Sequence, residues 1–432
     1  MNRADKESPD VHLNLNVRGL PLSATLRINE LSNQMSREGR QVYRMGLGQS
    51  PFPVPDSVQE ELRANAHQKD YLPVMGLSEL RNEVSDYILR TEGVHYGPEN
   101  VMIGPGSKEL MFIVQLAYYG DLVIPTPSWV SYAPQASIIG RHIRWLDTDI
   151  STHWKLMPMA LEALCRSDPE RPRLIILNYP ANPHGCTYSV EELKTLAELA
   201  RHYKLVLLSD EIYSGLHHEG KHVSISRFYP EGTIISNGIS KWAGAGGWRL
   251  GAFAFPKELS WLRDAMATVA SETFTSTAAP IQYAAIRAFE GGSDIDHYLK
   301  HTRRILKALG GLLTERLRED DIALADPQGA FYLFPDFESY RDRLKARGIT
   351  TSDDLCRSLL ADTGVAILPG TDFGRSPTEL TVRLAYVDFD GESALQASEQ
   401  VPANQSLDQA YLRIHCNSCI EAVARVREWL AK

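Results

Sequence analysis

Short apolar runs that alternate with helical patterns are the feature that most constrains the fold of this chain. Between about residues 76 and 300, several of these runs are apolar at every position, as in strands of a sheet that is covered on both faces. The runs are VMI at 101, LVI at 122, RLIIL at 173, LVLLSD at 205, TIIS at 233 and GAFAF at 251. This pattern predicts an α/β fold whose large, mainly parallel sheet is covered by helices on both faces.

The two ends of the chain predict a second, smaller α/β lobe. Residues 1–50 form an N-terminal arm, in which the helical pattern LPLSATLRINELSNQMSREGR precedes a strand and a loop rich in Pro and Gly. From about residue 297, a long charged helix leads into the strand-like stretches GAFYLFPDF, VAILPG and TVRLAYV and then into the C-terminal helix. We therefore expect a large domain over residues 51–297 and a small domain formed by 298–432 with part of the arm.

Composition and charge exclude several classes of function. The chain is 43% hydrophobic and 23% charged, which is typical of an ordinary globular protein. Its net charge of −9 repels phosphate backbones and anionic lipid, so neither nucleic acid nor a membrane is an expected partner. The first residues contain no apolar signal region, and no apolar run reaches the roughly 18 residues of a membrane span. We expect a cytoplasmic protein.

The cysteines do not indicate a disulfide framework, because the five of them are an odd and sparse set for a chain of this length. Cys416 and Cys419 form a CxxC beside His415, but no second pair of ligands stands near them in the sequence. We expect a solvated helix start of structural importance there, and no metal site. The stretch from about 390 to 415 is interpreted as an insertion before the last helix.

The ends of the apolar runs carry the residues with distinctive chemistry, and ligands of open parallel sheets bind outside the carboxyl ends of the strands. After VMI, Gly106 and Ser107 of GPGSKEL open a helix whose free N–H groups suit an anion such as phosphate. A tight turn is the alternative. After RLIIL, the prolines of NYPANPHG hold the amide of Asn182 in a set direction, although the motif could also be a rigid turn.

Two further strand ends carry charged groups. LVLLSD ends at Asp210, with Tyr213 three residues later. This carboxylate could be a helix cap or a metal ligand, but no cluster of ligand spacing joins it. After TIIS, Lys241 stands among Ser, Gly and Ala. If desolvated, or close to another cation, its amine would have a lowered pKa and could attack a carbonyl. Arg249, eight residues later, has a planar guanidinium that can bind a phosphate through two N–H groups at once.

One cofactor would use all four strand ends. Pyridoxal 5′-phosphate (PLP) has groups that match the chemistry of each: an aldehyde for Lys241, a ring nitrogen for Asp210, a ring hydroxyl for Asn182 and Tyr213, and a phosphate for the Gly106–Ser107 turn and Arg249.

NYPANPHG, SDEIY, SNGISK and GWRLG, in this order, resemble the signature motifs of the fold-type I, class I/II aminotransferases of the aspartate aminotransferase type. The resemblance extends from about residue 20 to the C-terminal helix. It implies that residues 51–297 bind PLP, that Lys241 forms the Schiff base and carries the Cα proton, and that the amino group of an L-amino acid passes to a 2-oxo acid such as 2-oxoglutarate by a ping-pong mechanism. It also implies a homodimer with shared active sites.

The same resemblance implies roles for further residues. Trp129 in TPSWVSY would stack on the pyridine ring, and Tyr71 would reach the phosphate of the neighbouring subunit. Arg383 in TVRLAYV would clamp the substrate α-carboxylate, in a site that Gly48 and Asn182 also line. One departure is Gly238, which stands where many relatives have a Ser or Thr that contacts the phosphate. Part of this contact must then come from Ser107, Ser240 or elsewhere.

The motifs leave the exact reaction and the substrate open. C–S lyases and decarboxylases of the same fold share the core motifs, whereas a PLP-sensing regulator would need a DNA-binding domain before the aminotransferase-like region. Lys108, directly after the phosphate turn, and Thr25 in LPLSAT resemble the positions that bind a distal carboxylate in aspartate- and prephenate-type aminotransferases. We favour an acidic amino donor slightly, and a neutral or aromatic donor is the alternative.

Overall fold

The computed structural model of the protein describes residues 12–402 and 404–432. The predicted N-terminal arm is therefore described from residue 12 on, and its first eleven residues lie outside the described part.

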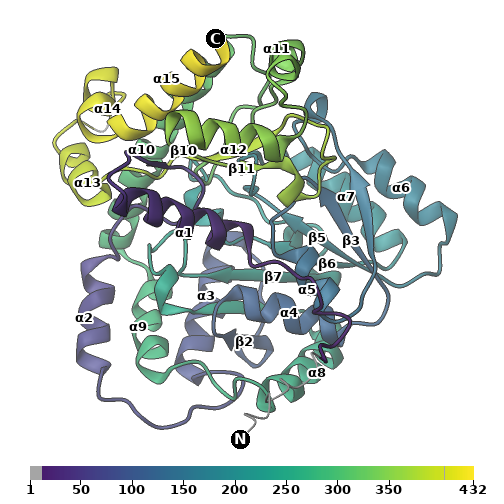
Figure 1. The fold of residues 1–432 in the computed structure, drawn as a ribbon. Helices are drawn as coiled ribbons and strands as arrows, with labels where there is room; N and C mark the ends of the chain where they lie inside the picture. The colour runs from purple at the N-terminus through teal and green to yellow at the C-terminus, as the bar shows by residue number, and fades with distance from the viewer. Residues whose placement is uncertain (1–11, 403) are drawn as a thin grey trace, which may run out of the picture.

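A seven-stranded sheet forms the centre of the larger lobe (Figure 1). Its strand order is β2-β8-β7-β6-β5-β3-β4, and only β8 runs antiparallel to its neighbours β2 and β7. The strands are β2 Val101–Gly104, β3 Asp121–Thr126, β4 Ile143–Asp147, β5 Arg173–Asn178, β6 Val206–Asp210, β7 Thr233–Gly238 and β8 Gly251–Ala254. The prediction of an α/β fold with a mainly parallel sheet is confirmed.

The edge strand β4 is absent from the sequence prediction, which had six runs. Its residues IRWLD are only partly buried, and Trp145 stays 40% exposed, so the segment has no continuous apolar run. An edge strand has one hydrogen-bonded neighbour, here β3, and needs less apolar surface than a central strand. This strand is defined by pairing rather than by composition.

Helices cover both faces of the sheet because alternate residues of each strand point to opposite sides. Leu174 and Ile176 of β5 pack in a core with one set of helices, α4 Ser107–Ala117, α5 Tyr132–Ile138 and α8 Ser260–Ser271. Ile175 and Leu177 of the same strand pack against α6 Pro158–Ser167 and α7 Val190–His202. Further along that face lie α2 Asp56–Asn65, α3 Ser78–Glu92 and α9 Ala279–Glu290.

The smaller lobe joins the two ends of the chain. Strand β1, Tyr43–Arg44, pairs parallel with β10, Val365–Ala366, so the arm adds a strand to the C-terminal part. The other elements are α1 Ala24–Arg37, α10 Ser293–Arg318, α11 Arg341–Ala346, α12 Ser352–Thr363 and the antiparallel sheet of β9 Tyr332–Leu333, β11 Leu368–Pro369 and β12 Val382–Ala385. The domain boundaries at residues 50 and 297 stay a prediction.

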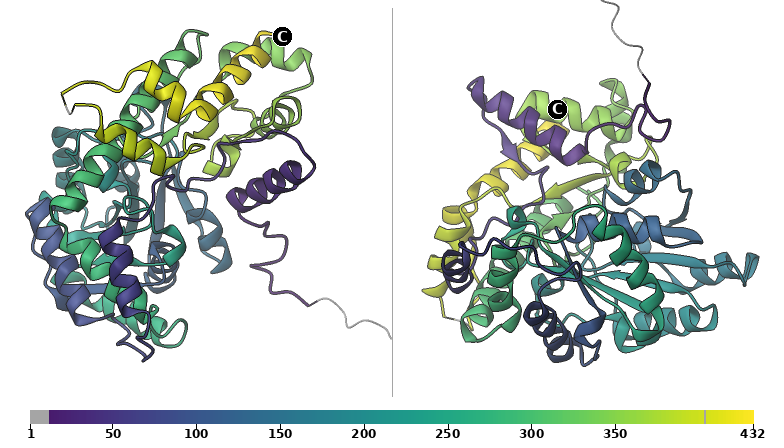
Figure 2. Two further views of the ribbon diagram at one scale, coloured as in Figure 1. Left: turned by 90° about the vertical axis from the view of Figure 1, so that its left-hand side faces the viewer. Right: turned by 90° about the horizontal axis from the view of Figure 1, so that it is seen from below.

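The stretch interpreted as an insertion forms two helices, α13 Gly391–Glu399 and α14 Gln409–His415, that lie beside the C-terminal helix α15, Asn417–Ala431 (Figures 1 and 2). The expectation of a solvated CxxC at this point is wrong. Cys416, the residue before α15, and Cys419 are both fully buried, because with Val423 they pack into the main core. All five cysteines are buried free thiols.

Within residues 12–402 and 404–432, every helix is too short or too polar to cross a membrane.

Candidate cofactor site

A cavity of about 570 Å³ opens at the carboxyl ends of the parallel strands, between the large sheet and the smaller lobe. It collects every predicted site residue except Gly106 and Tyr71. The predicted residues that line it are Gly48, Ser107, Lys108, Trp129, Asn182, Asp210, Tyr213, Ser240, Lys241, Arg249 and Arg383. Residues more than 300 positions apart in the sequence thus share one cavity.

Lys241 follows β7 and extends into this cavity. Its Nζ donates a hydrogen bond of 2.6 Å to the carbonyl oxygen of Gly48 and lies 5.6 Å from the ring centroid of Tyr213. Burial and, to a smaller extent, the nearby cations Arg383 and Arg249 together lower the pKa of Lys241 to about 8. The lowered pKa expected from the sequence for a confined lysine therefore has its physical causes here.

Asp210 is the last residue of β6, and its carboxylate is buried. The hydroxyl of Tyr132 donates to its Oδ2 at 2.6 Å, and Ser236 Oγ donates to its Oδ1 at 3.3 Å. Burial raises the pKa of Asp210 to about 6, although these hydrogen bonds favour the carboxylate. Sequence reasoning missed Tyr132. Its position three residues after Trp129 could have indicated it as a site residue. In the structure the rings of Tyr132 and Trp129 pack edge to face, with their centroids 5.2 Å apart.

The anion-binding end of the cavity is built on the start of α4. Gly106, the residue before the helix, has φ of 91°, and a methyl group in place of its hydrogen would overlap the guanidinium of Arg249. Arg249 donates from Nη1 to the carbonyl oxygen of Gly246 at 2.8 Å and is exposed. Ser107 and Lys108, the first two residues of α4, line the cavity together with this cation, and a helix start beside a guanidinium is an arrangement that binds phosphate.

Gly238 is explained by the close approach of two strands. A Cβ atom at this position would lie 2.8 Å from the carbonyl oxygen of Leu250, the residue directly before the neighbouring strand β8. A serine or threonine here would therefore require the strands to move apart. Ser107 and Ser240, which both line the cavity, are the hydroxyls available in its place.

Arg383 on β12 is buried, although a single arginine in such a sequence would ordinarily be a surface charge. Its Nη1 donates to Asn182 Oδ1 at 3.2 Å, and its Nη2 donates to the carbonyl oxygen of Gly46. Its guanidinium also lies 4.9 Å from the ring of Tyr332 and 5.1 Å from the ring of Phe373. No carboxylate pairs with Arg383 in the described parts of the chain, so its charge is available to a ligand.

Tyr213 and Tyr332 face each other across the cavity wall, with their hydroxyl oxygens 2.7 Å apart. Gly48 lies directly against this pair, because a Cβ atom on it would overlap the Tyr332 hydroxyl. Sequence analysis assigned GAFYLF only to the small domain and missed Tyr332 as a site residue. Asn178 was also missed: its side chain accepts from Asn182 N–H at 2.7 Å and donates to the Asp210 carbonyl at 2.9 Å.

Lys108 and Thr25, the pair suggested for a distal carboxylate, both line the cavity. Lys108 Nζ lies 5.7 Å from the ring centroid of Trp129. Burial lowers the pKa of Lys108, and the charge of Arg249 adds to this effect. Thr25 comes from α1 of the arm, which thus contributes directly to the cavity.

Tyr71 is not brought into this site. It lies between α2 and α3 and is 91% exposed. The position leaves it free to contact another molecule.

The donor set of the cavity fits pyridoxal phosphate. Among the described residues, four cationic side chains line it, Lys108, Lys241, Arg249 and Arg383, whereas Asp210 is the one carboxylate in the lining. An anionic ligand is needed to balance this charge. The absence of side chains at Gly106 and Gly48 leaves room beside Arg249 and Tyr332.

Comparisons with known proteins agree with this geometry. The family model for aminotransferase class I and II matches residues 40–390. The aspartate aminotransferase of Geobacillus stearothermophilus is 33% identical over 380 residues, which cover 86% of this chain and 93% of that protein. The solved aspartate aminotransferase from Rhizobium meliloti superposes with a TM-score of 0.81 at 26% identity, covering 98% of this chain and 99% of that one. That from Thermus thermophilus with maleate has a TM-score of 0.80 at 28% identity, covering 90% and 98%.

Proposed function

Since this chain belongs to the class I and II aminotransferases and is a PLP-dependent transaminase, we propose that it moves the amino group of an acidic L-amino acid to a 2-oxo acid such as 2-oxoglutarate. The observation that carries the proposal is the single cavity in which Lys241 lies with Arg383 and Lys108. Arg383 would bind the α-carboxylate that every amino acid has, and Lys108 would bind the side-chain carboxylate of an acidic donor.

Lys241 is proposed as the residue that bonds to the cofactor and moves the proton. When bound, PLP supplies an aldehyde carbon that reacts with amines and a ring that accepts the electron pair left on the substrate Cα. With a pKa of about 8, about a tenth of the Lys241 side chain is a neutral amine at pH 7. This neutral Nζ can accept the proton that leaves Cα and can donate it again in the second half of the reaction.

Asp210 and the residues around it are proposed to hold the ring. The Asp210 carboxylate keeps a proton on the ring nitrogen, and Tyr132 keeps that carboxylate in place through its 2.6 Å hydrogen bond. Asn182 and Tyr213 are proposed as partners of the ring hydroxyl, and Trp129 as the stacking surface. Gly106, Ser107, Ser240 and Arg249 are proposed for the phosphate, whose charge their N–H groups, hydroxyls and guanidinium match.

The acidic donor is supported by the position of Lys108 and Thr25 and by the relatives. Several proteins similar to this chain are named aspartate or aspartate/prephenate aminotransferases, and one of the similar structures is described as holding the dicarboxylate maleate. A partly buried ammonium with no anion to pair with penalises an apolar donor by a few kcal/mol, or on the order of a hundredfold in kcat/KM.

The test is a comparison of kcat/KM for aspartate, glutamate, alanine and phenylalanine. We expect aspartate and glutamate to lead in the wild type and this lead to shrink at least tenfold in Lys108→Ala. Lys194→Ala is the matched control, since Lys194 pairs with Glu191 on the surface of α7. A wild-type preference for alanine or phenylalanine, or a ranking that Lys108→Ala leaves unchanged, would show that the donor is neutral or aromatic.

A homodimer with shared active sites is part of the proposal. It is supported by the exposed ring of Tyr71 and by the arm at one side of the molecule (Figure 2, left), where Leu13, Leu15, Leu20, Leu22 and Leu26 are exposed. Mixing Tyr71→Phe chains with Lys241→Ala chains tests the sharing. A fully active monomer in sedimentation would refute it. A cytoplasmic location is also proposed, and the five free thiols support it.

A further inference from the structure

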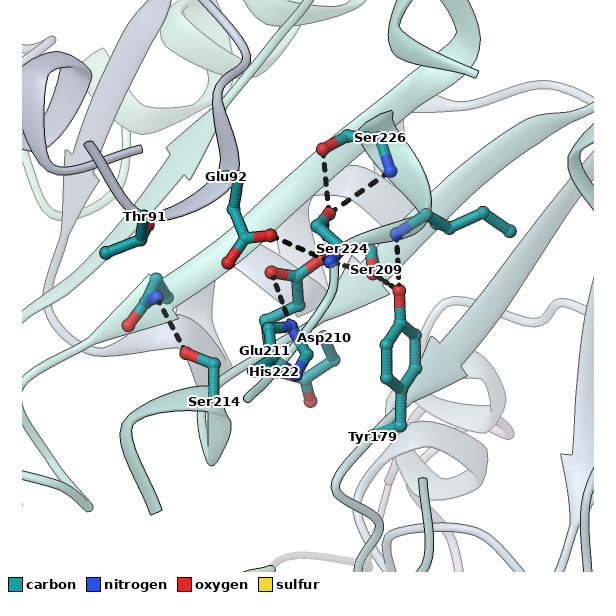
Figure 3. A network of polar contacts seen from close by, with 12 residues as sticks. Thr91, Glu92, Tyr179, Ser209, Asp210, Glu211, Ser214, His222, Ser224 and Ser226 are labelled. Atoms are coloured by element: carbon teal, nitrogen blue, oxygen red, sulfur yellow. Dashed lines mark hydrogen bonds and ion pairs between the residues drawn. The ribbon is translucent and has the colours of Figure 1, made fainter. Parts of the chain in front are cut away.

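A buried network of charged groups lies next to Asp210 (Figure 3), and its members Glu92, Glu211 and His222 are absent from the lining of the cofactor cavity. Glu211 directly follows Asp210, but it does not line the cavity, because successive residues of an extended chain point to opposite sides. Only 2% of the Glu211 side chain is exposed. Two buried carboxylates therefore occupy neighbouring positions of the chain on either side of the sheet.

Glu211 is held by three donors from two segments. Ser209 Oγ donates to its Oε1 at 2.7 Å, Ser224 Oγ donates to the same oxygen, and His222 Nε2 lies 3.1 Å from its Oε2. The His222 side chain is 5% exposed, and its ring stacks on Tyr179 with centroids 5.3 Å apart. Tyr179 belongs to NYPANPHG, so the network joins the ends of two strands that line the cavity.

A second carboxylate, Glu92 at the end of α3, completes the network. Its Oε2 accepts from Ser224 N–H at 2.8 Å and pairs with Arg227 Nε at 3.0 Å. When His222 is protonated, Glu92 and Glu211 are balanced by Arg227 and His222. When His222 is neutral, one negative charge is left unbalanced in the interior beside Asp210.

The surroundings favour the protonated form of His222. Burial alone would lower its pKa, but the charge and hydrogen bond of Glu211, with the charge of Glu92, outweigh burial and raise it above the usual value. His217 also lies close, and burial together with the charge of His222 lowers the pKa of His217 to about 4, so it stays neutral. Glu211 raises the pKa of Asp210, in addition to the effect of burial.

We propose that the His222–Glu211 ion pair is a positioning element of the active site: the cation of His222 offsets the charge of Glu211, and Asp210 can therefore remain a carboxylate in a buried position. This inference rests on the proposed role of Asp210 toward the ring nitrogen. His222 and Glu211 touch neither cofactor nor substrate, and they act through the charge state and placement of the neighbouring residue.

The test replaces each partner by glutamine, which keeps hydrogen bonding and removes charge. Two pH profiles are measured for each variant: kcat/KM of the loaded enzyme, and the affinity of the apoenzyme for PLP. In His222→Gln, the charge of Glu211 has no partner, and we expect the acid limbs of both profiles to move up by about one pH unit. In the double variant Glu211→Gln/His222→Gln, we expect both limbs to return to within about 0.3 unit of the wild type, because no net charge is changed.

Two controls separate this account from a purely structural role. Arg201→Gln also removes one positive charge, but from an exposed pair with Glu231, and it should leave both profiles in place. Histidine NMR of the wild-type protein needs no variant: His222 should be protonated on both ring nitrogens at pH 7. A neutral His222, an unshifted His222→Gln profile, or a double variant that is shifted as far as His222→Gln would each overturn the proposal.

Asp210→Asn distinguishes this inference from the proposed function on which it rests. If Asp210→Asn has the kcat/KM of the wild type, the proposed role of Asp210 itself is wrong. If Asp210→Asn is impaired while His222→Gln shows unshifted profiles, the role of Asp210 stands and only the inference about the ion pair fails.

Discussion

Replacing Tyr132 by phenylalanine removes one hydroxyl, the one that donates to Asp210 Oδ2 at 2.6 Å in a buried setting. A hydrogen bond to a charged group contributes about 1.5–3 kcal/mol. Since 1.36 kcal/mol corresponds to one pKa unit, its loss should raise the pKa of Asp210 from about 6 to about 7–8. The ionised fraction of Asp210 at pH 7 would fall from about nine-tenths to between about a half and a tenth.

The assay is the dissociation constant of PLP for the apoenzyme, measured from pH 5.5 to 9. Because a carboxylate at Asp210 favours binding of a ring that is protonated on nitrogen, Tyr132→Phe should bind PLP about two- to tenfold more weakly than the wild type at pH 7 and equally well near pH 9. Tyr229→Phe is the matched control: its buried hydroxyl donates to the Leu205 carbonyl at 2.9 Å, away from the cavity. The reasoning is refuted if Tyr132→Phe weakens binding equally at every pH, or not at all.

Three other predictions follow from the same geometry. Gly106→Ala should weaken PLP binding at least tenfold, because the methyl group meets Arg249 and φ is 91°; unchanged affinity in a binding titration would contradict this. Arg383→Lys should lower kcat/KM on the order of a hundredfold while PLP still binds, since an ammonium lacks the planar fork for a carboxylate; steady-state kinetics with normal activity would exclude this role. Cys416 and Cys419 should not react with a thiol reagent until the protein unfolds, because burial raises the pKa of both thiols, that of Cys416 to about 12; rapid labelling of either in the native protein would count against the structure.

The strand ends of the large sheet could be predicted from the sequence because two simple rules act there. A strand buried on both faces is an apolar run, and its carboxyl end faces the ligand side of the sheet. Asn182, Asp210 and Lys241 each follow such a run, and the structure places all three in one cavity. Their assignment needed only local patterns and the order of the motifs.

The parts that the sequence did not predict depend on contacts between distant segments. Tyr332 reaches Tyr213 only because the small lobe folds back onto the large sheet, and no local pattern near residue 332 indicates this contact. Likewise, Cys416 and Cys419 are buried by packing of α15 into the main core, whereas the sequence analysis expected a solvated helix start there. The ion pair of His222 and Glu211 joins residues only 11 positions apart, but it was also missed, because it forms only when the loop between them folds back.

The central claim is that Lys241 is the residue that bonds to the cofactor. It is tested most directly by reducing the PLP-loaded protein with borohydride, which fixes the cofactor on its lysine, and mapping the labelled peptide. The account predicts that the label is on Lys241 alone and that Lys241→Ala binds PLP without becoming labelled. A label on Lys108, the other lysine that lines the cavity, or on any lysine outside it, would contradict the account.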